Sequence, residues 1–325
     1  MPQKHARTLL AAGLVLAAVP LPGFAQSFPA STVTFVATAP AGGSIDAVAR
    51  LVAQDIARSL GQPVVVVNRA GAGGNIAADA VAKSRADGHT LLFTAASTLT
   101  INPWVYPSLP FDPEKSFAPV IMPARQNNIL VVHPKLGVSS TKEFVALMKA
   151  KPDALNYGSA GVGSLSHLAG VLFADQSGTS ATHIAFSGIA PSMTALLAGQ
   201  VDYMFDSATS LPHIRSGKLR ALGVMGPSKL AAMPELPTMR ELGYPGMETA
   251  RSWYGIFAPA GTPAEAIQRL NREIGAAMTR PEVADKVTAM GMEAATSTPE
   301  ELGTALRDAL KKWEPIVKRV GIKPN

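Results

Sequence analysis

The chain has 325 residues, of which 47% are hydrophobic and 16% are charged, so it is long enough for two domains that each bury a core. Its net charge is only +6, and it has no run of lysine and arginine and no basic face with interleaved aromatics, which excludes a nucleic-acid-binding protein. It contains no cysteine, which excludes a disulfide framework and a lipid-anchored lipoprotein.

The first 25 residues have the composition of a secretory signal peptide. Lys4 and Arg7 precede an apolar run over residues 8–19, and Gly23-Phe24-Ala25 places small residues at both cleavage-determining positions. An uncleaved membrane anchor is the alternative, but the run is too short to span a bilayer comfortably. We therefore expect cleavage after residue 25 and a mature periplasmic monomer. Its net charge would be +4, because both basic residues of the signal are lost.

The mature sequence alternates between apolar, β-branched runs and segments of helical periodicity. Such strand–loop–helix units predict mainly parallel sheets with helices on both faces. The almost purely valine run of residues 63–68 is typical of a strand buried on both faces. The predicted strands are 32–37, 63–68, 90–95, 128–133, 155–159, 182–186, 201–206, 219–225 and 252–258. Helices are predicted to start at Ser44 and after Asn75, to cover 141–150, 168–176, 191–198, 263–280 and 299–320, and to include a short one after Glu235.

The two terminal helices need a surface on which to pack. The economical arrangement is two α/β lobes, with residues 26–126 plus 251–325 forming lobe 1 and residues 127–250 forming lobe 2. Ligands of open α/β sheets bind beyond the carboxyl ends of the strands. Two facing lobes therefore predict a cleft lined by such loops.

Three loops rich in glycine or serine lie between a predicted strand and a helix start, at residues 40–46, 71–75 and 159–167. A helix start offers unpaired N–H groups and about half a positive charge, and glycine lets the backbone approach an anion. One such contact contributes only about 0.3–1 kcal/mol at a surface. For a single loop a tight turn is the simpler explanation, but three in corresponding positions favour a carboxylate site that needs no lysine or arginine.

Other chemistry has weaker support in the sequence. The Gly71–Ile76 segment lacks the last glycine of the dinucleotide fingerprint and has no Lys-Ser/Thr ending for a phosphate loop. The histidines show no paired metal-ligand spacing, and no Gly-x-Ser-x-Gly surrounds a serine, so we expect neither a metal nor an enzyme. Ser166-His167 is predicted to cap a helix and fix its loop.

Two aspartates have more than one interpretation. Asp46 and Asp206 could form a carboxylate pair if the lobes close. Asp46 fits equally well as a first-turn acid favoured by the helix dipole. Asp206, at the end of a predicted strand, could receive a ligand amine or orient water.

Specific motifs run through the whole mature chain, among them Pro40-Ala-Gly-Gly-Ser-Ile-Asp46, Gly61-Gln-Pro-Val-Val-Val-Val-Asn-Arg69, Gly71-Ala-Gly-Gly-Asn75 and Gly199-Gln-Val-Asp202. They closely resemble the Bug family, the TctC-like receptors of tripartite tricarboxylate transporters. The resemblance implies an α/β fold of the periplasmic-binding-protein type II kind. Its two lobes would close on a carboxylate, partly through ordered water and without a metal or organic cofactor. The implied partners are membrane permease subunits, with a sensory system or a secreted enzyme as the alternatives.

The resemblance also implies a set of ligand-binding residues and two departures from the family pattern. Ala39 stands where the family usually has an aromatic residue, and Ser187 where it commonly has lysine after a tyrosine. Losing a phenol and an ammonium shifts the expected ligand from a tricarboxylate to a mono- or dicarboxylate. The smaller Ala39 leaves room for an aromatic acid, unless neighbouring side chains refill the space. The implied ligand-binding residues are Pro40, Ala41, Gly42, Gly43, Ser44, Asp46, Ser97, Thr98, Ser159, Gly161, Gly163, Ser164, Ser166, His167, Phe186, Ser187, Gly188, Ala190, Pro191 and Asp206.

Overall fold

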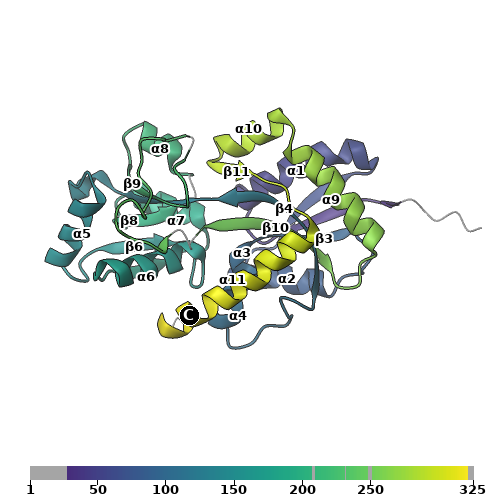
Figure 1. Cartoon of the computed structure of the whole chain (residues 1–325), viewed down its shortest axis with the longest axis horizontal. Helices are drawn as coiled ribbons and strands as arrows, with labels where there is room; N and C mark the ends of the chain where they lie inside the picture. The colour runs from purple at the N-terminus through teal and green to yellow at the C-terminus, as the bar shows by residue number, and fades with distance from the viewer. Residues whose placement is uncertain (1–27, 207–208, 231, 248–250, 321–325) are drawn as a thin grey trace, which may run out of the picture.

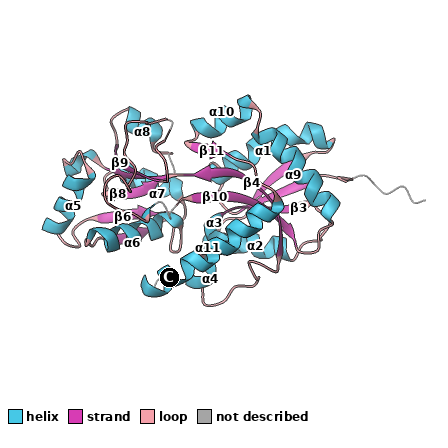
Figure 2. Ribbon diagram, viewed as in Figure 1, coloured by secondary structure: helices cyan, strands magenta, loops and turns pink. Residues whose placement is uncertain are grey.

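The computed structural model describes residues 28–206, 209–230, 232–247 and 251–320. These residues form two α/β units that lie side by side, each built around one sheet with helices on both faces (Figure 1, Figure 2). The predicted signal peptide lies outside the described residues. Within the described ranges, no helix is both long and apolar enough to cross a bilayer.

The first unit contains a six-stranded sheet. Its strands are β1 (Val33–Ala37), β2 (Val64–Asn68), β3 (Thr90–Ala95), β4 (Phe117–Gln126), β10 (Ser252–Pro259) and β11 (Met292–Ala294). Their order is β11-β4-β10-β3-β1-β2, with β10 antiparallel to both of its neighbours. Its helices are α1 (Ser44–Leu60), α2 (Asn75–Ala82), α3 (Ala96–Thr100), α4 (Asn102–Val105), α9 (Ala264–Met278), α10 (Pro281–Ala289) and α11 (Pro299–Val320). Helices α1, α9 and α10 pack into one core cluster, and α2, α3 and α11 into another.

The second unit contains a five-stranded sheet in the order β7-β6-β8-β5-β9. Its strands are β5 (Asn128–Val132), β6 (Asn156–Ser159), β7 (Thr182–Ala185), β8 (Tyr203–Asp206) and β9 (Arg220–Met225). Its helices are α5 (Thr141–Ala150), α6 (Leu165–Ser177), α7 (Ile189–Leu197) and α8 (Leu211–Arg215). Helices α5 and α6 pack into one core cluster, and α7 and α8 into another.

The chain passes from the first unit to the second between β4 and β5, and it returns at β10. β4 leads into β5 through Asn127 alone, and β10 follows the second unit. We keep lobe boundaries at 126/127 and 250/251 as a proposal, which is supported by the distribution of the strands between the two sheets. Helix α11 contacts both units, because Leu306 belongs to a core cluster of the first and Arg319 forms an ion pair with Asp175 of the second. Figure 1 shows this helix running from one unit to beneath the other.

Helix α1 follows the predicted periodicity. Val48, Val52 and Ile56 recur at four-residue steps and are completely buried against the first sheet. The helix ends where Gly61 adopts a left-handed φ of 68° and its N–H bonds to a carbonyl of the last turn. The helix begins at Ser44, directly after the predicted glycine loop of residues 40–43.

The valine strand differs from the prediction. β2 is the outermost strand of its sheet, and Val65 and Val67 are 42% and 41% exposed, so the strand is not buried on both faces. The sheets are also mixed rather than mainly parallel, because β5 and β10 arrive from the opposite unit. Apolar content alone does not reveal whether a strand lies at the edge of a sheet.

Several elements were not predicted, namely β4, α3, α4, α8, α10 and β11. β4 contains Pro119 and Pro123, which normally argue against an inner strand. Irregular register with β10 accommodates them. The short helix predicted after Glu235 is wrong: the described residues there form turns, and Thr238 makes an isolated bridge to Val224.

Candidate functional site

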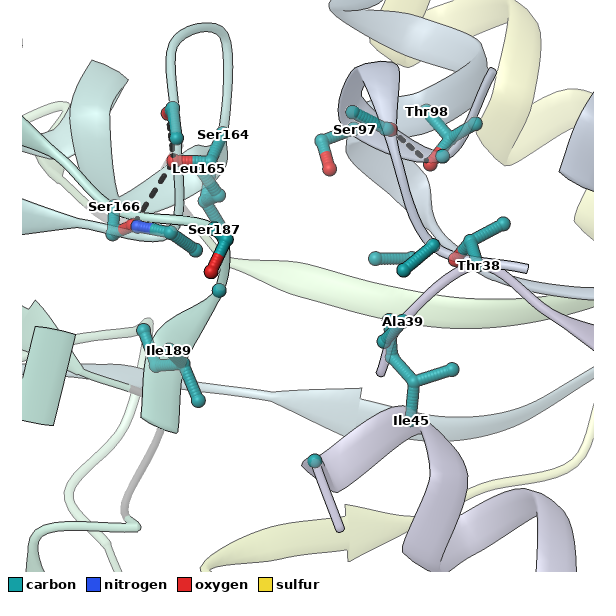
Figure 3. Close-up of a pocket in the computed structure, with 18 of the residues that line it drawn as sticks. Thr38, Ala39, Ile45, Ser97, Thr98, Ser164, Leu165, Ser166, Ser187 and Ile189 are labelled. Carbon is teal, nitrogen blue, oxygen red and sulfur yellow. Dashed lines mark hydrogen bonds between the residues drawn. The ribbon is translucent and has the colours of Figure 1, made fainter. Parts of the chain in front are cut away.

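A cavity of about 760 Å³ lies between the two units and is lined by residues of both. Figure 3 shows Thr38, Ser97 and Thr98 of the first unit across the cavity from Ser164, Ser166 and Ser187 of the second. This volume is within the usual range of small-molecule sites, about 300–1,000 Å³. The cavity is therefore the candidate ligand site.

The loop before α1 is fixed by a buried carboxylate. Asp46 accepts hydrogen bonds from the Gly42 N–H at 2.9 Å, from Nε of Arg50 at 3.0 Å and from Nδ2 of Asn68 at 2.9 Å. Burial alone would raise the pKa of Asp46, but these hydrogen bonds together hold it below its usual value. Asp46 does not line the cavity; it anchors the loop of Pro40–Ser44 that does.

Asp46→Asn is expected to destabilise the protein by about 1–3 kcal/mol, because an amide cannot accept all the hydrogen bonds that the carboxylate receives. Urea unfolding measures this change. The matched control is Arg50→Gln, whose side chain is 53% exposed and whose loss should cost at most about 1 kcal/mol. Equal losses in both variants would contradict the anchoring role of the carboxylate.

Strand β10 adds the phenol of Tyr254 to the same wall. Ser44 Oγ lies 2.7 Å from the hydroxyl of Tyr254 on β10, and both residues line the cavity. Burial raises the pKa of Tyr254 well above its usual value, so the phenol stays neutral and can donate a hydrogen bond.

The glycine loop of residues 71–75 is held by side chains of α3 and α4. Thr98 Oγ1 and Asn102 Nδ2 each donate to the Gly73 carbonyl at 3.0 Å. Gly74 has φ of +95°, and a Cβ added there would lie 2.6 Å from Thr98 Oγ1. This close approach requires glycine and brings Ser97 and Thr98 to the cavity.

In the second unit, the loop before α6 forms the facing wall. Ser164 is the N-cap of α6: its Oγ accepts the His167 N–H at 3.3 Å and donates to the Gly161 carbonyl at 2.6 Å. Ser166 Oγ accepts the N–H of Ala160 at 3.0 Å. Ser164 rather than Ser166 is thus the cap, and both hydroxyls line the cavity.

A third helix start lies beside it. The Phe186–Pro191 segment lines the cavity, and α7 begins within it at Ile189. Helices α1, α6 and α7 therefore all begin at the cavity wall. Because the first N–H groups of a helix lack intrahelical partners, three helix starts offer converging donors and positive dipole ends to an anion.

Asp206 lies outside the lining of the cavity. It is completely buried, and its carboxylate accepts hydrogen bonds from Thr209 Oγ1 at 2.7 Å and from the Ser210 N–H at 2.6 Å. Neither Asp206 nor Asp46 lines the cavity. Both carboxylates are engaged by hydrogen bonds within their own unit, so the structure does not bring them together as a pair.

The cavity wall has a simple chemical character. Among the described residues that line it there is no aspartate, glutamate, lysine, arginine or histidine. No cluster of three or more potential metal ligands occurs in the described parts of the chain. The described lining therefore offers a ligand hydroxyls, amides, backbone groups and apolar side chains.

The structure brings fourteen of the twenty sequence-predicted residues to the cavity and places six behind its wall. The fourteen are Pro40, Ala41, Gly43, Ser44, Ser97, Thr98, Gly161, Ser164, Ser166, Phe186, Ser187, Gly188, Ala190 and Pro191. Those that do not line it are Gly42, Asp46, Ser159, Gly163, His167 and Asp206.

Lining residues that the sequence did not single out come mostly from strands and short helices. Gln126 and Asn128 flank the crossing from β4 to β5. They belong to three consecutive amide residues between apolar runs, a pattern from which a polar site could have been predicted. Tyr254 lies within an apolar strand and gave no such signal. The remaining polar ones are Thr38, Asn102, Tyr106 and Ser252.

Comparison with known proteins agrees with this geometry. A family model described as the tripartite tricarboxylate transporter family receptor, TctC, matches residues 48–322. A structure of Rpa4515 from R. palustris with adipate has a TM-score of 0.87 and 34% identity, covering 92% of this chain and 100% of that one. The periplasmic binding protein BugD has a TM-score of 0.85 and 31% identity, covering 92% of this chain and 100% of BugD. MatC from Rhodopseudomonas palustris, with bound malate, has a TM-score of 0.82 and 33% identity, covering 89% of this chain and 100% of MatC.

These matches confirm the resemblance seen in the glycine-rich motifs and the predicted two-lobed α/β fold of periplasmic binding proteins. The matched proteins are solute-binding proteins rather than enzymes, which also agrees with the sequence prediction. The chain therefore belongs to the TctC family of tripartite tricarboxylate transporter receptors and is a solute-binding protein.

Proposed function

We propose that the protein captures a small carboxylate in the periplasm by closing its two lobes and delivers it to the permease subunits of a tripartite tricarboxylate-type transporter. The observation that carries this proposal is a cavity at which three helices begin and whose described lining has no charged side chain. Such a wall can neutralise a carboxylate through N–H groups and hydroxyls. The adipate and malate bound by two similar proteins support this ligand class.

The ligand is proposed to be a mono- or dicarboxylate, including aromatic acids. Ala39 and Ser187, the two departures from the family pattern, both line the cavity. None of the described residues that line the cavity therefore supplies an ammonium for a third carboxylate. Ile45, Leu165 and Ile189 add apolar surface that suits an aliphatic or aromatic body.

Native mass spectrometry of protein purified without denaturation is expected to show a co-purified acid. A thermal-shift panel of adipate, malate, benzoate, phthalate and citrate then tests the class directly. We expect a mono- or dicarboxylate of the panel to raise the melting temperature and citrate to have the smallest effect. A protein with no retained acid and no response to any panel member would contradict the proposal.

Delivery to a transporter needs a separate test. Deleting the gene is expected to abolish uptake of the bound acid, and the wild-type gene is expected to restore it. Retained uptake with a lost transcriptional response to the acid would instead identify a sensory partner.

Ser187→Lys is expected to tighten binding of dicarboxylates and citrate about tenfold relative to benzoate, because it adds an ammonium to an otherwise uncharged wall. Isothermal titration at low and high salt measures this selectivity. Ser187→Met is the matched control, with similar length and no charge. A similar change in both variants would show that side-chain size, not charge, governs selectivity at this position.

A further inference from the structure

Two imidazole rings stack directly behind the cavity wall of the second unit. His167 lies in the first turn of α6 and His183 lies on β7, with ring centroids 3.9 Å apart and an interplanar angle of 9°. The ring of Tyr157 on β6 lies against that of His183, with centroids 4.8 Å apart and the two planes tilted by 31°. Neither imidazole lines the cavity, but each contacts the loop of residues 159–163 that leads into its wall.

His167 accepts a hydrogen bond from this loop. The Gly163 N–H donates to Nδ1 of His167 at 3.2 Å. A backbone amide nitrogen is only a donor, so Nδ1 must carry a lone pair. The ring proton of His167 therefore lies on Nε2.

His183 accepts through its other nitrogen. Ser159 Oγ lies 2.6 Å from Nε2 of His183, and the same oxygen accepts the Gly161 N–H at 3.1 Å. The Ser159 hydroxyl proton can go to the imidazole or to the Gly161 carbonyl at 3.2 Å, and the imidazole is much the closer acceptor. On these distances we assign Nε2 of His183 as the acceptor, with the ring proton on Nδ1.

The two rings are therefore opposite tautomers, and both must be uncharged. A protonated imidazole has no acceptor nitrogen, so a charged His167 would lose its bond from the Gly163 N–H. A charged His183 could only donate to Ser159 Oγ, and the serine hydroxyl would then turn to the Gly161 carbonyl. Burial lowers the pKa of both histidines, which keeps them neutral near pH 7.

We propose that His167 and His183 are positioning residues for the ligand, acting as a pair of neutral hydrogen-bond acceptors that hold the loop before α6 in its binding shape. The backbone at Gly161 and Gly163 has φ values of +123° and +76°, which glycine adopts freely, so the hydrogen bonds to the imidazoles can select this shape among those open to the loop. The held loop presents Ser164 and Ser166 to the cavity. The link to ligand binding rests on the proposed function; the support of the loop does not.

Nitrogen-15 NMR of imidazole-labelled full-length mature protein tests the tautomers without any ligand. At pH 7 we expect His167 with its proton on Nε2 and His183 with its proton on Nδ1. A charged ring, or the same tautomer in both residues, would overturn the proposal.

Matched substitutions test the positioning role. Asparagine at 167 and glutamine at 183 place a carbonyl oxygen near the original acceptor nitrogens, whereas leucine provides none. In His167→Leu and His183→Leu, amide exchange at Gly163 and Gly161 is expected to be at least about tenfold faster than in the wild type. In His167→Asn and His183→Gln it should stay within about threefold. Equal acceleration in leucine and polar variants would show that the rings only fill space.

Titration with adipate and with benzoate extends the test to binding. The leucine variants should lose about tenfold or more in affinity for whichever acid binds the wild type, and the polar variants about threefold or less. Unchanged affinity in the leucine variants would overturn the positioning role. If neither acid binds the wild type, the failure concerns the proposed function, and the tautomers and exchange rates still decide whether the pair supports the loop.

Discussion

Trp313→Ala is expected to lower the free energy of unfolding by about 3–5 kcal/mol, the range found when a buried aromatic is truncated. Trp313 is 4% exposed and lies in the core cluster that joins Ile101 and Val105 of the first unit to the core of the second, whereas the first half of its helix packs on the first unit. The substitution leaves a cavity where α11 joins the two units. Chemical unfolding monitored by circular dichroism measures the loss.

Two further variants on the same helix separate packing from charge. Trp313→Phe retains most of the buried ring and should cost about 1–2 kcal/mol. Arg319→Gln breaks an ion pair with Asp175 at 3.0 Å, but both side chains are at least half exposed, so the change should stay below about 1 kcal/mol. A loss of less than about 1.5 kcal/mol for Trp313→Ala would contradict the view that α11 fastens the second unit through its core.

The loops of the site could be predicted because their signals are local. Glycine and serine between an apolar run and a helical segment mark a strand end followed by a helix start, and Gly43, Gly74 and Ser164 occupy such places. The structure places a helix start at each of these predicted loops. Local sequence therefore indicates where donors can converge.

The direction of each side chain within those loops could not be predicted. Asp46 turns away from the cavity because Asn68, 22 residues away, supplies a donor on the neighbouring strand. His167 turns inward because His183 from β7 offers a ring on which to stack. Each partner is brought close by sheet pairing, which a local pattern does not contain.

The strands that cross between the units posed the same difficulty. Tyr254 reaches the cavity because β10 runs antiparallel between β3 and β4, a placement that follows from pairing and not from its own residues. The prolines of β4 argue against a strand in the sequence. The irregular register that accommodates them is set by pairing with β10. Polar residues on such strands can be assigned to a site only after the topology is known.

Acidification from pH 7 to pH 5 is expected to remove about 3 kcal/mol of stability through His167 and His183, after allowing for the partial exposure of His183. Burial, together with repulsion from His183, lowers the pKa of His167 to about 3. Burial lowers the pKa of His183 to about 4. In the unfolded chain both titrate near pH 6.5. Between these values the unfolded chain binds protons that the folded chain does not, so this stability is present above pH 6.5 and is lost as the pH falls to about 4 for His183 and about 3 for His167.

The double variant His167→Asn/His183→Gln isolates this contribution, because it keeps the acceptors of the loop and removes the titrating rings. Urea unfolding of both proteins at pH 7, 6 and 5 should show the stability of the wild type falling about 3 kcal/mol further than that of the variant. The carboxylates titrate alike in both and cancel in the difference. A difference that does not change with pH would mean that the rings are not held neutral. The support of the ligand loop by two acceptor imidazoles would then be untenable as well, because a ring that protonates in this range cannot accept the Gly163 N–H or the Ser159 hydroxyl.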